Sequence, residues 1–170
     1  MTELAQNDPA CITEELRMVR DQVRRFIAEE VLPHADRWEE EGALPRDLFR
    51  KLGDLSLLGM RHPEEYGGTD LGPVASAVWA EELGRSGYGS LPAAVLVHTD
   101  MASPHISELG TDEQKRKYLP GIASGELRLQ SMAVTEPTTG TDTTKLKTTA
   151  VKTGDRYVVN GQKVWISRIR

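Results

Sequence analysis

The sequence predicts an α+β chain in which an all-α helical bundle is followed by an incomplete antiparallel, β-barrel-like domain. Apolar residues recur at helical spacing through most of the first 125 residues, and glycine or proline marks the ends of these stretches. After Glu126, short apolar runs alternate with turn formers, which is typical of strands. We therefore expect a disordered N-terminus over residues 1–12, a helical domain over 13–125 and a partial β-domain over 126–170.

Composition excludes several classes of protein. The 170 residues are 28% charged and 38% hydrophobic, which favours a soluble folded chain over a disordered one. A net charge of −5 without a basic stripe argues against nucleic-acid binding. The single cysteine, Cys11, excludes an internal disulfide and reads as an inert thiol. With no apolar run of about 20 residues and no leader-like N-terminus, we expect a cytoplasmic protein without a membrane span.

The first helical stretch covers residues 13–41. Thr13 can cap its N-terminus, Pro33 is expected to kink or restart the helix, and Gly42 ends it. Its apolar face consists of Leu16, Val19, Val23, Phe26 and Ile27.

Four further helices are predicted over residues 45–55, 73–83, 90–109 and 111–119. The third of these is apolar around most of its circumference, so it should be buried on most sides. The last begins with a capping box, Thr111 to Gln114, and Pro120 is expected to help end it. His98 and His105 share a helix face, but a metal site needs three or four ligands, so we expect no metal.

Residues 131–167 carry the chemistry. A short strand, 132–134, leads into the loop TEPTTGTD at 135–142, which is dense in hydroxyls and turn formers. Pro137 fixes its own φ, and Gly140 permits a close approach that a Cβ would block. Amides and hydroxyls at such a turn can hold a phosphate or the edge of a flat polar ligand. Strands at 157–159 and 162–166 are expected to form a hairpin at Asn160–Gly161.

These residues carry a family resemblance. T-E-P-x-x-G-[ST]-D at 135–142, G-D-x-Y at 154–157 and N-G-x-K-x-W-I-[ST] at 160–167 occur in the order and spacing of the acyl-CoA dehydrogenase family. P-E-E-Y-G-G at 63–68 resembles the family too, and the likeness runs from about Leu16 onward. The resemblance implies an FAD flavoprotein, of which this chain is similar to the N-terminal helical domain and the start of the middle β-domain.

The resemblance also implies which residues contact FAD. They are Met132 and Val134 at the ring, Thr135 and Ser167 near N5, Gly140 and Thr141 at the phosphates, and Trp165 against the flavin. A ring that accepts hydride needs fixed donors at its polar edge, which suits these residue types. Taken singly, each hydroxyl could merely stabilise a turn and the tryptophan could anchor a core; taken together, their spacing favours flavin.

Residues for the acyl chain are less distinctive. The resemblance makes Thr141, Val97, Met101 and Ile106 candidates for binding the substrate, although core packing explains the last three equally well. Glu136 and Asp142 could suggest an acid–base pair, but we interpret both as stabilising the loop.

The implied reaction is α,β-dehydrogenation of an acyl-CoA in fatty-acid β-oxidation, by a homotetramer that passes electrons to an electron-transfer flavoprotein. In the family the catalytic glutamate comes from a C-terminal helical domain, so no catalytic residue is expected here. The family continues Ile-[ST] with Asn-Gly, whereas this sequence reads Arg168-Ile169-Arg170, which suggests a truncated gene or a fragment. Two alternatives stay open: a non-catalytic remnant or docking module, and an acyl-CoA oxidase-like relative that gives electrons to oxygen.

Overall fold

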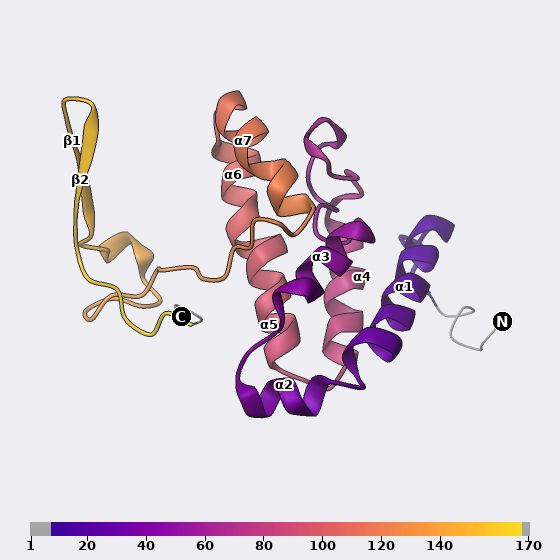
Figure 1. The fold of residues 1–170 in the computed structure, drawn as a ribbon. Coiled ribbons are helices and arrows are strands. Elements are labelled where there is room, and N and C mark those ends of the chain that lie inside the picture. Colours follow the sequence, from indigo (N-terminus) through magenta and orange to yellow (C-terminus); the bar gives the residue numbers. More distant parts are fainter. Residues whose placement is uncertain (1–7, 168–170) are drawn as a thin grey trace. The chain divides into compact units, whose positions relative to one another are not determined.

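The computed structural model describes residues 8–167, and the chain divides into two compact units after Leu129. We call residues 8–129 the helical unit and residues 130–167 the β unit (Figure 1). The predicted α+β class is confirmed, because helices fill the first unit and a small, unclosed two-stranded antiparallel sheet forms in the second.

Seven α-helices form the helical unit. They are α1 (Glu14–Phe26), α2 (Ala35–Glu41), α3 (Arg46–Asp54), α4 (Gly72–Arg85), α5 (Ser90–Leu96), α6 (Ser103–Leu109) and α7 (Asp112–Ala123). A short 3₁₀ turn, Glu64–Tyr66, lies in the long connection before α4. No helix of the described residues combines the length and the apolar character that a membrane crossing requires.

The break predicted in the first helical stretch is confirmed. Thr13 caps α1, since its hydroxyl accepts a hydrogen bond from the Leu16 amide at 3.2 Å. A wider, π-type turn (Ile27–Val31) follows α1, and the helix restarts as α2 beyond Pro33, which has no amide proton to donate. Gly42 ends α2 with φ of +65°, a conformation that glycine adopts without steric cost.

The long apolar helix predicted over residues 90–109 is continuous but not uniform. A π-type segment, Val97–Ala102, joins α5 to α6. Pro104 lies in the first turn of α6 and cannot donate to the carbonyl four residues before it, which favours a wider turn at this point. The hydroxyls of Thr99 and Ser103 donate to the carbonyls of Val95 and Thr99, at 3.1 and 2.9 Å.

The start of α7 follows the prediction, and its end does not. The capping box is confirmed, because Gln114 N–H donates to the Thr111 hydroxyl at 3.3 Å and the Gln114 side chain accepts from Thr111 N–H at 2.8 Å. The prediction that Pro120 ends the helix is wrong: Pro120 lies inside α7. Leu119 and Ile122 are both fully buried, and this burial outweighs the backbone hydrogen bond that proline removes.

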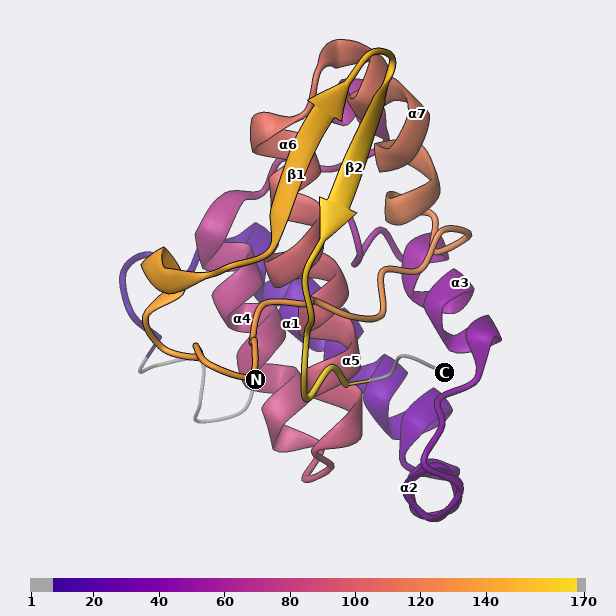
Figure 2. The same cartoon turned by 90° about the vertical axis from the view of Figure 1, so that its left-hand side faces the viewer.

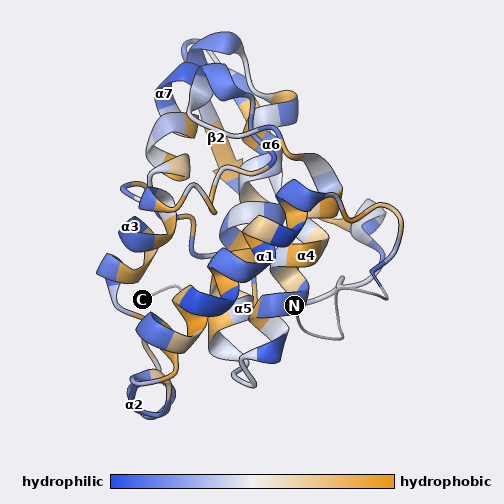
Figure 3. Cartoon of the chain, turned by 90° about the vertical axis from the view of Figure 1, so that its right-hand side faces the viewer, coloured by the Kyte–Doolittle hydropathy of each residue, from blue (hydrophilic) through white to orange (hydrophobic). Residues whose placement is uncertain are grey.

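The helical unit has one main core and one smaller cluster. Side chains of α1 to α5 and of the connections between them form the main core, in which Trp79 and Phe49 are the largest fully buried residues. Tyr66, Leu119 and Ile122 form the smaller cluster. Figure 3 shows the pattern behind this packing: α1 carries many hydrophilic residues, whereas α4 is more hydrophobic along its length.

A buried ion pair joins α1 to α4. Both Oε atoms of Glu82 accept from the Arg24 guanidinium, at 2.8 and 2.9 Å, and Arg20 Nε lies 3.5 Å from the same carboxylate. The Glu82 side chain is only 2% exposed. A carboxylate buried this deeply needs such partners to stay charged.

The described part of the segment before α1 packs onto the helix. Asp8 accepts from Arg20 at 2.7 Å and from Arg17 at 3.1 Å, and Ile12 joins the core. These contacts concern residues 8–12 of the N-terminal segment that the sequence assigns to disorder; residues 1–7 lie outside the described residues.

The β unit contains one hairpin, made of β1 (Thr149–Thr153) and β2 (Arg156–Asn160), which lie side by side in Figures 1 and 2. The strands are antiparallel, with Thr149 opposite Asn160 and Thr153 opposite Arg156. Gly154 has φ of +62°, as a type I′ or II′ hairpin turn requires of its first central residue.

Two predictions for this unit are wrong. The hairpin turns at 154–155, not at Asn160–Gly161, because β2 pairs back onto β1 and the chain continues beyond β2 without regular structure. Gly161 serves a close approach instead, since a Cβ there would lie 2.1 Å from the Thr148 hydroxyl. Neither residues 132–134 nor residues 162–166 form a strand. The bond from the Val164 amide to the Thr135 carbonyl, at 2.9 Å, is the one backbone bond linking the described segments 131–135 and 162–167.

Candidate functional site

The loop at 135–142 is a turn with a defined hydrogen-bond pattern. Glu136 and Thr139 exchange both backbone bonds, at 2.8 and 3.1 Å, around Pro137, whose fixed φ suits a central position of a turn. Asp142 then caps a short 3₁₀ turn, Thr143–Lys145, by accepting from the Thr144 amide at 3.3 Å. The loop is therefore held by its own backbone and acidic side chains.

Glu136 is the most enclosed acidic group of the β unit. Its side chain is 3% exposed and accepts from the amides of Lys147 at 2.7 Å and Thr148 at 2.9 Å, and from the Lys163 ammonium at 3.0 Å. The Thr148 side chain lowers the pKa of Glu136 most, although its hydroxyl makes no hydrogen bond to the carboxylate. The two amides and Lys163 lower it further, and the resulting pKa is about 2. Glu136 is thus a charged carboxylate whose oxygens already accept hydrogen bonds, so it is not placed to act as a catalytic base.

Lys163 connects the loop to the last described segment. Its ammonium donates to the Val134 carbonyl at 2.8 Å as well as to Glu136. Further along, the Ser131 hydroxyl donates to the Ser167 carbonyl at 2.6 Å. Segments 131–136 and 163–167 therefore lie side by side in opposite directions.

This arrangement brings together the residues predicted to contact the ring. Met132, Val134 and Thr135 are half-buried in the first segment. Among the described residues, neither the amide nor the hydroxyl of Thr135 has a hydrogen-bond partner. Gly140 lies beside it, since a Cβ on Gly140 would be 3.9 Å from the Thr135 methyl group, and Thr141 follows on the exposed side of the loop.

The second segment presents Trp165 and Ser167. Trp165 is 88% exposed and has φ of +57°, which is rare for a bulky residue and is typical of strained functional positions. Ser167 is exposed as well, and its carbonyl is the one that Ser131 contacts. An exposed indole in the segment whose backbone pairs with Thr135 is an arrangement that fits a flat, polar aromatic ligand.

The residues predicted for the acyl chain are divided between the two units. Val97 and Met101 belong to the π-type segment of the helical unit, with Met101 47% exposed, whereas Ile106 packs against the smaller cluster. Thr141 belongs to the β unit. Their role in substrate binding stays a prediction.

His98 and His105, which were predicted to share a helix face, lie in different environments. His98 is fully buried, with Nε2 2.9 Å from the Ile122 carbonyl and Nδ1 accepting from the Leu129 amide at 3.1 Å, while His105 is exposed. Within residues 8–167 there is no group of three or more possible metal ligands. His62 is buried too, and burial lowers the pKa of both His62 and His98.

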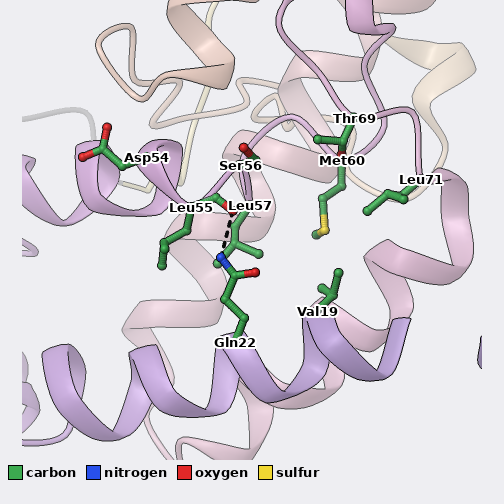
Figure 4. Close-up of a pocket in the computed structure, with 9 residues that line it drawn as sticks. All are labelled: Val19, Gln22, Asp54, Leu55, Ser56, Leu57, Met60, Thr69 and Leu71. Atoms are coloured by element: carbon green, nitrogen blue, oxygen red, sulfur yellow. Dashed lines mark hydrogen bonds between the residues drawn. The ribbon is translucent and has the colours of Figure 1, made fainter. Parts of the chain in front are cut away.

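A separate pocket of about 360 Å³ lies in the helical unit (Figure 4). Gln22 of α1 donates to the Leu55 carbonyl across it at 3.2 Å, and Thr69 contributes a buried hydroxyl without a partner among the described residues. Its lining includes none of the residues predicted for flavin or substrate. The pocket is therefore distinct from the candidate site.

Sequence reasoning missed two contributors to the site. Lys163 was recognised only as part of a motif, and Thr148 not at all. No local pattern in the sequence indicates either residue, because both act on Glu136 across more than ten positions of the chain.

Fold and site together define a protein that joins a helical domain to a β-domain carrying a polar ligand loop. The acyl-CoA dehydrogenase N-terminal domain matches residues 13–126, and the acyl-CoA dehydrogenase middle domain matches residues 131–169. The chain belongs to the acyl-CoA dehydrogenase family.

Similar proteins support the same assignment. A probable acyl-CoA dehydrogenase of Bacillus subtilis is 37% identical over 92% of this chain, which spans 40% of that relative. The solved acyl-CoA dehydrogenase of Geobacillus kaustophilus is 40% identical with a TM-score of 0.86, over 94% of this chain and 41% of its own. That of Bacillus anthracis, solved in complex with FAD, is 37% identical with a TM-score of 0.82, over 93% of this chain and 27% of its own.

Proposed function

We propose that this chain carries the flavin-contacting part of an FAD-dependent acyl-CoA dehydrogenase that oxidises the Cα–Cβ bond of an acyl-CoA thioester. The observation that carries the proposal is Thr135, which lies in the family's loop with its amide and hydroxyl unpartnered among the described residues. FAD, when bound, supplies the acceptor for the hydride that leaves the β-carbon.

The residues of this chain would bind and orient that cofactor. Thr135 and Ser167 offer hydroxyls at the ring edge, Trp165 covers a face of the ring, and Gly140 leaves room for phosphate beside Thr141. Donors that are fixed before binding need no reorganisation when charge develops on the ring. This chain's part of the reaction is thus positioning and electrostatic stabilisation.

Proton abstraction requires a group from elsewhere. Glu136 and Asp142, the two carboxylates of the loop, are both engaged in hydrogen bonds, so neither is free to act as the base. We propose that the base is a glutamate in a region of the longer relatives that this chain does not match. The complete assembly would be a cytoplasmic homotetramer that passes electrons to an electron-transfer flavoprotein.

The engaged carboxylates also favour a second candidate, a flavin-binding module that performs no turnover by itself. Both candidates predict FAD binding, and only the first predicts acyl-CoA oxidation when the region of the longer relatives that this chain does not match is supplied. Release of peroxide in the complemented reaction would identify an oxidase-like variant of the first.

An absorption spectrum tests the shared step. The purified chain is incubated with FAD, freed of unbound cofactor and scanned for a flavin band. We expect a band that weakens in Thr135→Ala and Trp165→Ala but not in the controls Thr149→Ala and Tyr157→Ala, which alter exposed residues of the hairpin. A wild-type chain that stays colourless, or equal loss in all four variants, would contradict the proposal.

A further inference from the structure

The loop that carries Thr135 is fastened on both sides of this residue. Lys163 donates to the Val134 carbonyl at 2.8 Å and to Glu136 Oε1 at 3.0 Å, so one ammonium bridges the residues before and after Thr135. The Thr135 carbonyl itself accepts from the Val164 amide at 2.9 Å. Thr135 therefore keeps only its amide and hydroxyl unpartnered among the described residues, in a fixed orientation.

Glu136 is anchored independently of Lys163. The Lys147 amide donates to Oε2 at 2.7 Å and the Thr148 amide donates to Oε1 at 2.9 Å, which ties the carboxylate to the chain that leads into β1. Bonds from charged groups to enclosed partners are about twice as strong as neutral ones. Glu136 thus connects the loop that carries Thr135 to both the segment before β1 and the segment after β2.

Charge adds a second effect. Glu136 is 3% exposed, and Lys163, at 24% exposed, is the cation that lies against it within the described residues. Without Lys163 the enclosed negative charge would be compensated by amide dipoles alone. A bare carboxylate beside an electron-accepting ligand opposes reduction of that ligand.

We propose that Lys163 and Glu136 form a positioning clamp that presents the amide and hydroxyl of Thr135 to the flavin and cancels the carboxylate charge next to it. The proposal rests on the proposed function and extends it to two residues that do not themselves contact the ligand. Lys163 is a positioning residue, because it acts through Thr135 and Glu136.

A double-mutant cycle read out by FAD affinity tests the clamp. FAD is titrated into the full chain, and flavin fluorescence reports binding to wild type, Thr135→Val, Lys163→Met and the double variant. Each single change should weaken binding about tenfold, and the double variant should lose about tenfold rather than about a hundredfold, since residues that act as a unit are not additive. Lys163→Arg should recover most of the loss, and Lys152→Met, on an exposed lysine of β1, is the matched control.

A merely structural lysine would give losses that multiply, because general destabilisation is independent of Thr135. Multiplicative losses, or Lys163→Met with unchanged affinity, would overturn the clamp. The charge effect has its own readout: the reduction potential of bound flavin should fall in Lys163→Met and return toward the wild-type value in Glu136→Gln/Lys163→Met.

Hydrogen exchange separates failure of the clamp from failure of the proposed function. In the flavin-free chain, Lys163→Met should speed exchange of the Val164 amide and leave the β1–β2 amides unchanged. Unchanged exchange at Val164 would refute the clamp whether or not FAD binds. A wild-type chain that shows no FAD binding would refute the proposed function. The contacts of the clamp could then still exist, but they would not serve flavin binding.

Discussion

Acidification should destabilise the helical unit through one histidine. His98 joins three parts of this unit: it sits in the π-type segment, contacts the Ile122 carbonyl of α7 through Nε2, and accepts the Leu129 amide through Nδ1. Its ring also lies edge-on against Phe49, with centroids 5.5 Å apart. Protonation of Nδ1 would break the Leu129 bond and place a charge in the core, near His62 and Arg128.

The magnitude follows from the pKa. Burial lowers the pKa of His98 from 6.5 to about 4. Because the folded pKa is the lower one, the unfolded chain takes up the proton first, so stability is constant above about pH 7 and falls as the pH drops from about 6.5 toward 4. The loss should be about 2 kcal/mol by pH 5 and about 3 kcal/mol when complete.

Urea unfolding followed by the helical circular-dichroism signal measures this effect. At pH 7, His98→Gln should cost about 2–4 kcal/mol, because Gln cannot serve both backbone partners in the same place. Between pH 7 and pH 5 the gap between wild type and His98→Gln should narrow by about 2 kcal/mol. The control His105→Gln, on an exposed ring, should track wild type at both values. A gap that does not change with pH would refute the reasoning.

Three further outcomes are expected from changes in the helical unit, each measured by urea or thermal unfolding. Glu82→Gln should cost about 3 kcal/mol of unfolding free energy, because it leaves Arg24 facing an uncharged buried group. The control Glu81→Gln, in an exposed pair with Arg85, should cost under about 1 kcal/mol, and equal costs would contradict the burial argument. Gly125→Ala should lower the melting temperature by several degrees, since a Cβ would lie 2.2 Å from the Phe49 carbonyl at φ of +76°; an unchanged melting temperature would show that the chain relaxes there freely. Pro120→Ala should stabilise α7 by about 1 kcal/mol, and a loss of stability would mean that the proline ring packs usefully.

The helices were predictable because their signals are local. Capping by Thr13, the stop at Gly42 and the capping box at Thr111 depend on neighbours within a turn, and all three are present in the structure. The error at Pro120 arose where burial of Leu119, which depends on residues far away in the chain, overrode a local rule.

The β unit was harder because two glycine-containing turns compete for one hairpin. Gly154–Asp155 and Asn160–Gly161 are both hairpin signals, and the choice between them depends on pairing of 149–153 with 156–160. Residues of the candidate site were recognisable from motif spacing, but Lys163 and Thr148 gained meaning only when the chain brought both to Glu136. Such long-range partners of a single carboxylate leave no local pattern in the sequence.

The fluorescence of the three tryptophans reports on the two units separately. Trp38 and Trp79 are 6% and 0% exposed in the helical unit, whereas Trp165 is 88% exposed in the β unit. Buried indoles emit at shorter wavelength than solvated ones, so one emission spectrum contains separable contributions from the two units. A flavin that covers Trp165 would quench the long-wavelength part first, and unfolding of the helices would shift the short-wavelength part. Events in either unit can thus be followed in the unlabelled chain, with Trp165→Phe assigning each band.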